Sequence, residues 1–111
     1  MAYDERLAQR IRTIAGDEPD LTEKTMFGGL AFLVGGNMAI AASGQGGALV
    51  RVDPAESDSL VATTNARVAV MRDRPMPGWL RVGPEDLGTK DEVAKWVDLG
   101  TAYARALPAK R

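Results

Sequence analysis

The chain has 111 residues and a formal net charge of −1, with 45% apolar and 5% aromatic residues. This size and balance predict one globular domain over residues 1–111, and they argue against a disordered chain. The near-neutral charge and the few aromatic rings give no global signal for nucleic-acid binding. Histidine and cysteine are both absent, which excludes disulfides, thiol nucleophiles and the usual general base, so we expect no catalysis, no cofactor and no metal.

The N-terminal segment predicts a helix from about Asp4 to Ala15. Asp4 is a suitable N-cap, and Gly16 follows where a helix often ends. Apolar residues recur at helical spacing and form one stripe: Tyr3, Leu7, Ile11 and Ile14. The same segment is charged throughout and lacks the apolar core of a signal peptide, and no run is long enough to span a membrane. We therefore expect a cytoplasmic protein.

A glycine-rich stretch follows, and it predicts an antiparallel meander of three strands. The strands are expected at Thr25–Val34, Met38–Ala42 and Ala48–Val52, joined by the turns "GGN" and "SGQGG". Gly28 and Gly29 fall inside the first of these strands. A phosphate-binding loop would need glycines at a strand-to-helix turn, and no such motif is present. A bulge or a close packing contact is the preferred interpretation of this glycine pair.

The second half predicts two helices and two strands. "DPAE" is a strong helix start at Asp53, and a capping box of Thr89 and Glu92 begins the last helix, which extends to about Leu107. Strands are expected at Arg67–Met71 and Gly78–Val82, with the segment "RDRPMPG" between them as a loop. The predicted order is α-β-β-β-α-β-β-α. It corresponds to an α+β fold with an antiparallel sheet of about five strands and helices at the N-terminus, middle and C-terminus.

Four motifs in this order resemble the TfoX N-terminal domain family: "MFGGLAFLVGGNMAIA", "LVRVD", "MPGWLRVGPEDL" and "DEVAKWVDLGTAYA". The family-motif residues are Met26, Phe27, Gly28, Gly29, Trp79 and Trp96. The resemblance implies a stand-alone form of the N-terminal half of competence regulators, which assist transcription of DNA-uptake genes. It supplies no catalytic residues. It favours a regulatory or adaptor domain that acts through protein–protein contacts.

Arginines dominate the charge between Leu60 and Pro84, where Asp73 is the one opposing acid and the local net charge is +3. The candidate residues for an acidic protein partner or nucleic acid are Arg67, Arg72, Arg74 and Arg81, and Arg51 can join them through the sheet. The alternative, which the near-neutral overall charge favours, is a solvated face on which these arginines pair with helix acids. Nucleic acid is the less favoured partner, because the whole chain is nearly neutral.

Two further interpretations remain open. A cleft between the sheet and the helices near Met26, Phe27 and Trp79 could bind a small molecule or support weak catalysis, and it should then appear as an apolar pocket with a few polar groups. The meander "MAIAASGQGGALV" could present a flat sheet edge, through which two identical chains would pair as a homodimer.

Overall fold

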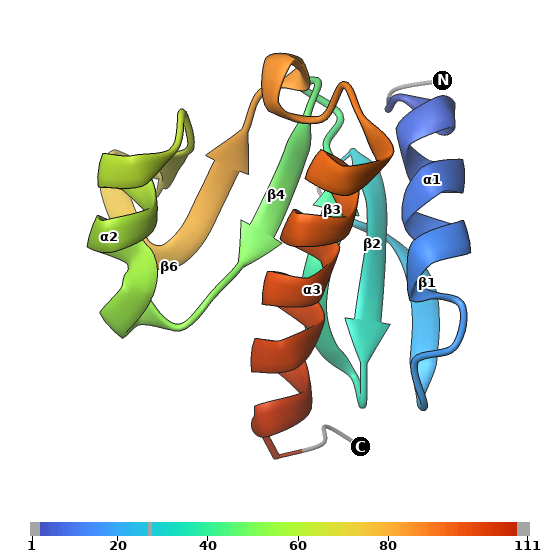
Figure 1. The fold of residues 1–111 in the computed structure, drawn as a ribbon. Helices are drawn as coiled ribbons and strands as arrows, with labels where there is room; N and C mark the ends of the chain where they lie inside the picture. Colours follow the sequence, from blue (N-terminus) through green and yellow to red (C-terminus); the bar gives the residue numbers. More distant parts are fainter. Residues whose placement is uncertain (1–2, 27, 109–111) are drawn as a thin grey trace.

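The computed structural model describes residues 3–26 and 28–108. Three α-helices and one six-stranded antiparallel sheet make up this part of the chain (Figure 1). The predicted α+β class and the predicted alternation of helices and strands are confirmed. The sheet has six strands rather than about five, because the first predicted strand is in fact two.

The first helix, α1 (Glu5–Ala15), begins and buries its residues as the sequence predicts. The Asp4 carboxylate accepts hydrogen bonds from the backbone N–H groups of Arg6 and Leu7, at 2.9 and 3.2 Å. Leu7 and Ile11 on the predicted apolar stripe are buried. The cap fixes where α1 begins. The apolar stripe then packs against the sheet, because burying apolar surface away from water stabilises the fold.

The strands of the glycine-rich stretch are β1 (Leu21–Met26), β2 (Gly29–Val34), β3 (Asn37–Ala42) and β4 (Ala48–Arg51). The prediction that Gly28 and Gly29 lie inside one strand is wrong. Gly28 has φ +75° and lies in the turn between β1 and β2, a conformation that favours glycine. A Cβ on Gly29 would collide with the backbone carbonyl of Ala42. Both glycines are therefore architectural, at a turn and at a close backbone approach.

The sheet order is β1-β2-β3-β4-β6-β5, so β3 and β4 are interior strands. The prediction that the meander presents a sheet edge is therefore wrong, because β3 pairs with β2 and β4, and β4 also pairs with β6. The edges of the sheet are β1 and β5 (Arg67–Met71).

The helix α2 (Pro54–Thr63) and the hairpin of β5 and β6 (Arg74–Val82) follow β4. Asp53 caps α2 as predicted, accepting a bond from the Ala55 N–H at 2.9 Å. The segment "RDRPMPG" is not a loop, since β6 begins at Arg74. Prolines are tolerated at its start because β4 pairs only with residues 79–82 of β6, which leaves the earlier part without a neighbour on that side.

A short 3₁₀ turn (Pro84–Asp86) leads to the last helix, α3 (Lys90–Ala106). The predicted capping box is present, with the Thr89 and Glu92 side chains each bonded to the other's backbone N–H at 3.1 Å. Gly100 lets α3 lie directly on β3, because a Cβ there would collide with the Ala39 carbonyl.

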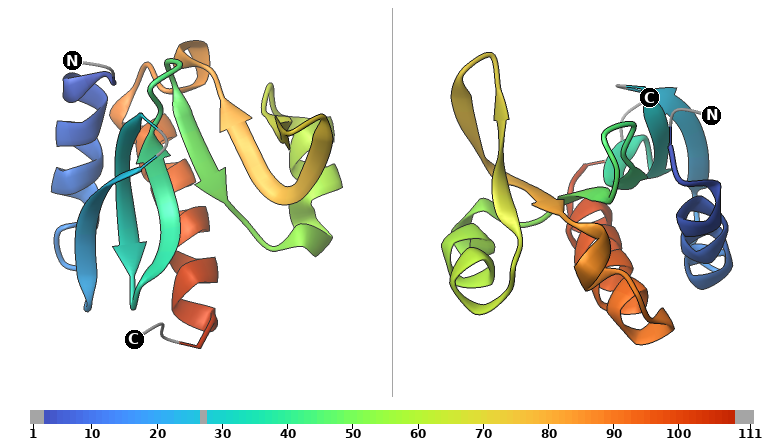
Figure 2. Two further views of the ribbon diagram at one scale, coloured as in Figure 1. Left: turned by 180° about the vertical axis from the view of Figure 1, so that it is seen from behind. Right: turned by 90° about the horizontal axis from the view of Figure 1, so that it is seen from above.

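The helices α1 and α3 lie on one face of the sheet, while α2 lies over β6 on the same side (Figures 1 and 2). The main hydrophobic core fills the space between this face and the helices. Its largest fully buried side chains include Trp96, Phe32, Ile11, Ile40 and Leu80. The opposite face of the sheet is seen from behind in Figure 2, where none of the described helices covers it.

Candidate functional site: an open sheet face with arginines

The open face carries a row of side chains, one from each strand, fixed by the sheet register. The row runs Lys24, Ala31, Ala41, Leu49, Arg81 and Arg67. Its centre is small and apolar, and both ends are cationic. Alternation along each strand sends these side chains away from the helix-covered core.

A second apolar cluster surrounds the row on this face. Its buried members are Ala31, Leu33, Met38, Ala41, Leu49 and Ala69, and the half-buried side chains packed on it are Met26, Met71 and Trp79. This cluster is separate from the main core, so the open face has its own apolar floor. Its six buried members are recessed rather than exposed.

A hollow of about 300 Å³ opens over this floor. Three parts of the chain form its walls: the end of β1, the turn between β3 and β4, and the tip of the β5–β6 hairpin. The residues that line it include Met26, Leu49, Met71, Val70, Arg72 and Arg81. This hollow is not the predicted cleft between sheet and helices: it shares Met26 with that prediction, but none of the described helix residues lines it, and neither does Trp79. Its walls are apolar and carry two guanidinium groups. Phe27, which was assigned to the predicted cleft, lies outside the described residues.

Arg72 reaches this hollow from a strained turn. Arg72 and Asp73 form the two-residue turn between Met71 and Arg74, with φ of +52° and +63°. Asparagine and glycine adopt this conformation most readily, and other side chains adopt it at a cost of about 1 kcal/mol or more. The fold holds an arginine in this costly conformation at the rim of the hollow.

Arg81 lies deeper and is half-buried. Its guanidinium contacts the Ser43 hydroxyl at 3.4 Å, a long hydrogen bond, and Arg67 lies directly opposite it on β5. Within residues 3–26 and 28–108, the ion pairs are Arg12–Glu23 and Arg105–Glu18, so Arg67, Arg72 and Arg81 have no acidic partner there. The alternative in which these arginines pair with helix acids is thus absent from the described structure.

The other two candidate arginines are placed differently. Arg74 is exposed at the start of β6 and does not line the hollow. The Arg51 guanidinium lies over the ring of Trp79 at 4.9 Å and near the ring of Tyr103 at 5.6 Å. Arg51 thus connects β4, β6 and α3 through cation–π contacts. The structure brings three of the five arginines together and gives Arg51 a structural contact instead.

The two tryptophans also divide between the faces. Trp96 is buried in the main core. Trp79 is half-buried and packs on the open-face cluster, next to Arg51.

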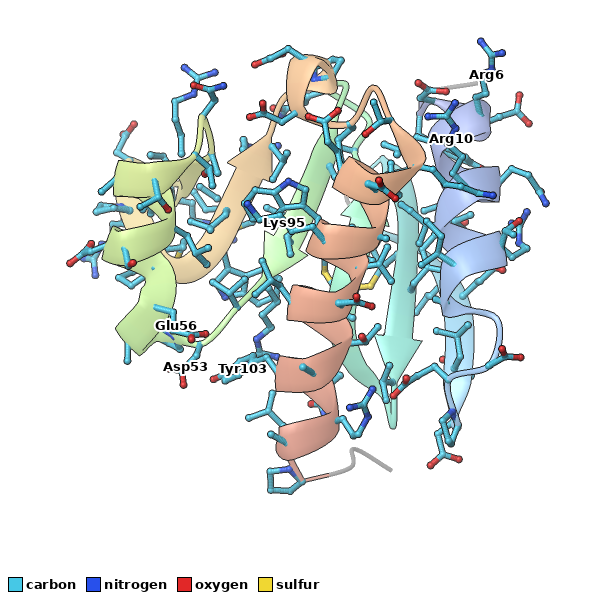
Figure 3. All side chains as sticks on the ribbon, in the orientation of Figure 1. Arg6, Arg10, Asp53, Glu56, Lys95 and Tyr103 are labelled. Atoms are coloured by element: carbon cyan, nitrogen blue, oxygen red, sulfur yellow. The ribbon has the colours of Figure 1, made fainter. Side chains whose placement is uncertain are left out.

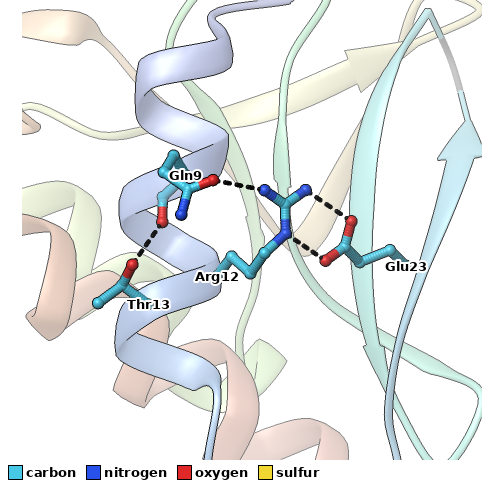
Figure 4. Close-up of polar contacts among 4 residues, drawn as sticks. All are labelled: Gln9, Arg12, Thr13 and Glu23. Atoms are coloured by element: carbon cyan, nitrogen blue, oxygen red, sulfur yellow. Dashed lines mark hydrogen bonds and ion pairs between the residues drawn. The ribbon is translucent and has the colours of Figure 1, made fainter.

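The ion pairs lie away from the open face. Arg12 of α1 holds Glu23 of β1 through two bonds of 2.6 and 2.8 Å, and it also bonds Gln9 (Figure 4). Arg105 holds Glu18 in the same manner, with two bonds of 2.7 Å. Hydrogen bonding to these arginines lowers the pKa of Glu18 and of Glu23 below the usual range.

Sequence reasoning missed a second, larger hollow of about 590 Å³ between α2 and α3. Asp53 and Glu56 border it on the α2 side, and Lys95 and Tyr103 on the α3 side (Figure 3). The charged side chains that line it are mainly acidic, whereas those of the open-face hollow are basic, so the two hollows differ in the sign of their charge. Helical spacing could have identified the exposed face of α3 but not its distance from α2.

The described part of the chain has neither a cluster of metal-ligating side chains nor a helix suited to crossing a membrane. No cluster of three or more metal-ligating side chains lies within residues 3–26 and 28–108. Across the same residues, no helix combines the length and the apolar character needed to cross a bilayer.

These features define a small α+β domain that covers one sheet face with helices and presents arginines on the other. The family model of the TfoX N-terminal domain matches residues 14–104, so the chain belongs to this family. The resemblance noted in the sequence is thereby confirmed. Comparisons with curated proteins and with solved structures returned no significant match.

Proposed function

We propose that this chain is a non-catalytic regulatory domain that binds an acidic segment of a protein partner on its open sheet face. Membership of the TfoX N-terminal domain family supports a regulatory role in transcription or competence. The observation that carries the proposal is that Arg72 and Arg81 line an apolar hollow and Arg67 lies opposite Arg81 on the next strand, all three without an acidic partner among the described residues.

Guanidinium groups suit this role. An arginine binds a carboxylate through two parallel hydrogen bonds and is more weakly hydrated than a lysine, so it loses less on entering an interface. The apolar floor beside the arginines supplies the area that a purely electrostatic contact lacks. A segment with both carboxylates and apolar side chains fits this surface better than a nucleic-acid backbone does.

Charge reversal tests the proposal. We expect affinity capture from native cells to retain a defined acidic protein with the wild-type domain and to lose it with Arg67→Glu/Arg81→Glu. The matched control is Arg6→Glu on α1, an exposed arginine on the other side of the molecule (Figure 3). Capture that is equal for all forms would contradict the proposal. A duplex DNA that binds at low salt and is released steeply as salt rises would favour nucleic acid instead.

The hollow itself supports a second candidate, a small apolar acid as ligand. Its walls combine Leu49, Met71 and Val70 with two guanidinium groups, the combination that an aliphatic carboxylate needs. Titration with decanoate should then shift the methyl signals of Met26 and Met71 in NMR spectra while leaving Met38 unchanged. If decanoate shifts none of these signals, this candidate is removed.

A further inference from the structure

We propose that the partner binds by strand addition, pairing with the free edge of β5 and extending the sheet by one strand. This inference rests on the proposed function and names the way in which the acidic segment is held. The strand β5 is the last in the sheet order, and its hairpin rises away from the helices (Figure 2, right).

The hairpin geometry identifies which backbone groups of β5 are free. Met71 and Arg74 flank a two-residue turn and therefore exchange both of their backbone hydrogen bonds. The next residue along, Val70, consequently points its N–H and C=O away from β6. The extra residues at the register shift belong to β6, so β5 continues as a regular strand. The backbone N–H and C=O of Val68, two residues before Val70, therefore also point away from β6. A partner strand would find these groups at the correct spacing.

The other edges of the sheet are protected, and β5 is not. Pro75 and Pro77 occupy the part of β6 that β4 leaves uncovered, where they remove donors. The β1 edge carries Glu23 and Lys24, and Glu23 is held by an arginine of α1. Charges and prolines of this kind are the usual protection against strand pairing. The outer part of β5, from Val68 to Met71, contains neither, and Val70 is 58% exposed.

The side chains around this edge define the chemistry of the added strand. On the open face, its neighbours are Arg67, Ala69 and Met71, with Arg81 beyond Arg67. By strand alternation, its neighbours on the opposite face are Val68 and Val70, and Val70 at the edge also borders the hollow. A strand that alternates carboxylates with β-branched apolar residues complements both faces. A second copy of β5 fits less well, because each hairpin would bring three arginines, Arg67, Arg72 and Arg74, and only Asp73 to oppose them.

A synthetic peptide of eight alternating Glu and Val residues is the probe, with an alternating Lys–Val peptide as its charge control. We expect the Glu–Val peptide to bind and to protect the Val68 and Val70 amides from hydrogen exchange. Methylation of alternate backbone nitrogens, in two peptides that cover both registers, should weaken binding roughly tenfold or more in one of them, because the inter-strand bonds are lost.

Substitution of Val70 gives an independent test. Val70→Pro removes an outward N–H that the hairpin does not use, so we expect retained folding by circular dichroism and a similar loss of peptide binding. Val70→Thr keeps the N–H and the β-branch and should bind as the wild type does. Peptide binding that survives both the methylation and Val70→Pro would overturn strand addition, as would pairing of β5 with a second copy in sedimentation.

Failure of this inference can be distinguished from failure of the proposed function. If Arg67→Glu/Arg81→Glu abolishes capture of the protein partner while Val70→Pro does not, the open face is used without its edge. If neither variant changes capture, both the mode and the face are wrong.

Discussion

Arg67 of β5 and Arg81 of β6 lie directly opposite each other on the open sheet face, and no acid among the described residues pairs with either. Like charges at opposed positions of a sheet destabilise it. Under the proposed function, the carboxylates of an acidic partner would offset this repulsion.

Replacement of Arg67 by Gln should stabilise the free domain. The substitution removes the repulsion of Arg81, and we expect the free energy of unfolding to rise by a few tenths of a kcal/mol, because Arg67 is exposed and screened. Urea unfolding at low and at high salt measures this change. The gain should shrink as salt rises; a gain that is unaffected by salt would show that repulsion is not its cause.

The strained turn at the hairpin tip gives a second stability prediction. Asp73 has φ +63°, so Asp73→Gly should raise the free energy of unfolding by about 1 kcal/mol through relief of this strain. The control is Asp58→Gly in the exposed part of α2, which should lower it by a few tenths of a kcal/mol, because aspartate is already a poor helix former. Equal effects of both substitutions in urea unfolding would contradict the interpretation.

Gly100 should resist replacement although it lies within a helix. Alanine favours a helix over glycine by about 1 kcal/mol, yet a Cβ at residue 100 would collide with the backbone carbonyl of Ala39. We expect Gly100→Ala to destabilise the domain by about 2 kcal/mol, because α3 must move off the sheet. Gly88→Ala, where a Cβ has room, is the matched control and should be close to neutral. Thermal unfolding of the two variants measures this difference in stability.

The ion pair between Arg105 and Glu18 predicts a pH dependence. Hydrogen bonding to Arg105 lowers the pKa of Glu18 in the folded chain relative to the unfolded one. The pair therefore stabilises the fold above the unfolded pKa of about 4.3, and this stabilisation is lost as the pH falls through the folded pKa.

Glu18→Gln is the variant that checks this dependence. Its free energy of unfolding should fall less steeply than that of the wild type between about pH 5 and pH 3. The two curves should converge at the acid end, where the carboxyl of the wild type is protonated. Parallel curves across this range would show that the pair contributes nothing.

The local structure of this protein is largely determined by its sequence. The caps at Asp4, Asp53 and Thr89 each use a side chain to satisfy backbone N–H groups a few residues away, so a short window suffices to predict the helix starts. Helical spacing likewise identified the buried stripe of α1. Family membership was evident from four motifs in their order along the chain.

Two features are visible only in the tertiary structure: a turn whose residues do not ordinarily favour its conformation, and the arrangement of the site. The turn at Arg72 and Asp73 has no turn signature, since the surrounding hairpin imposes its conformation. Strand order made β5 an edge, β3 an interior strand and Arg81 a neighbour of Arg67. These relationships join residues distant in the chain, and they depend on which strands pair. The sequence identified the candidate arginines, and only the pairing of β6 with β4 and β5 showed that Arg81 lines the hollow and has Arg67 opposite it.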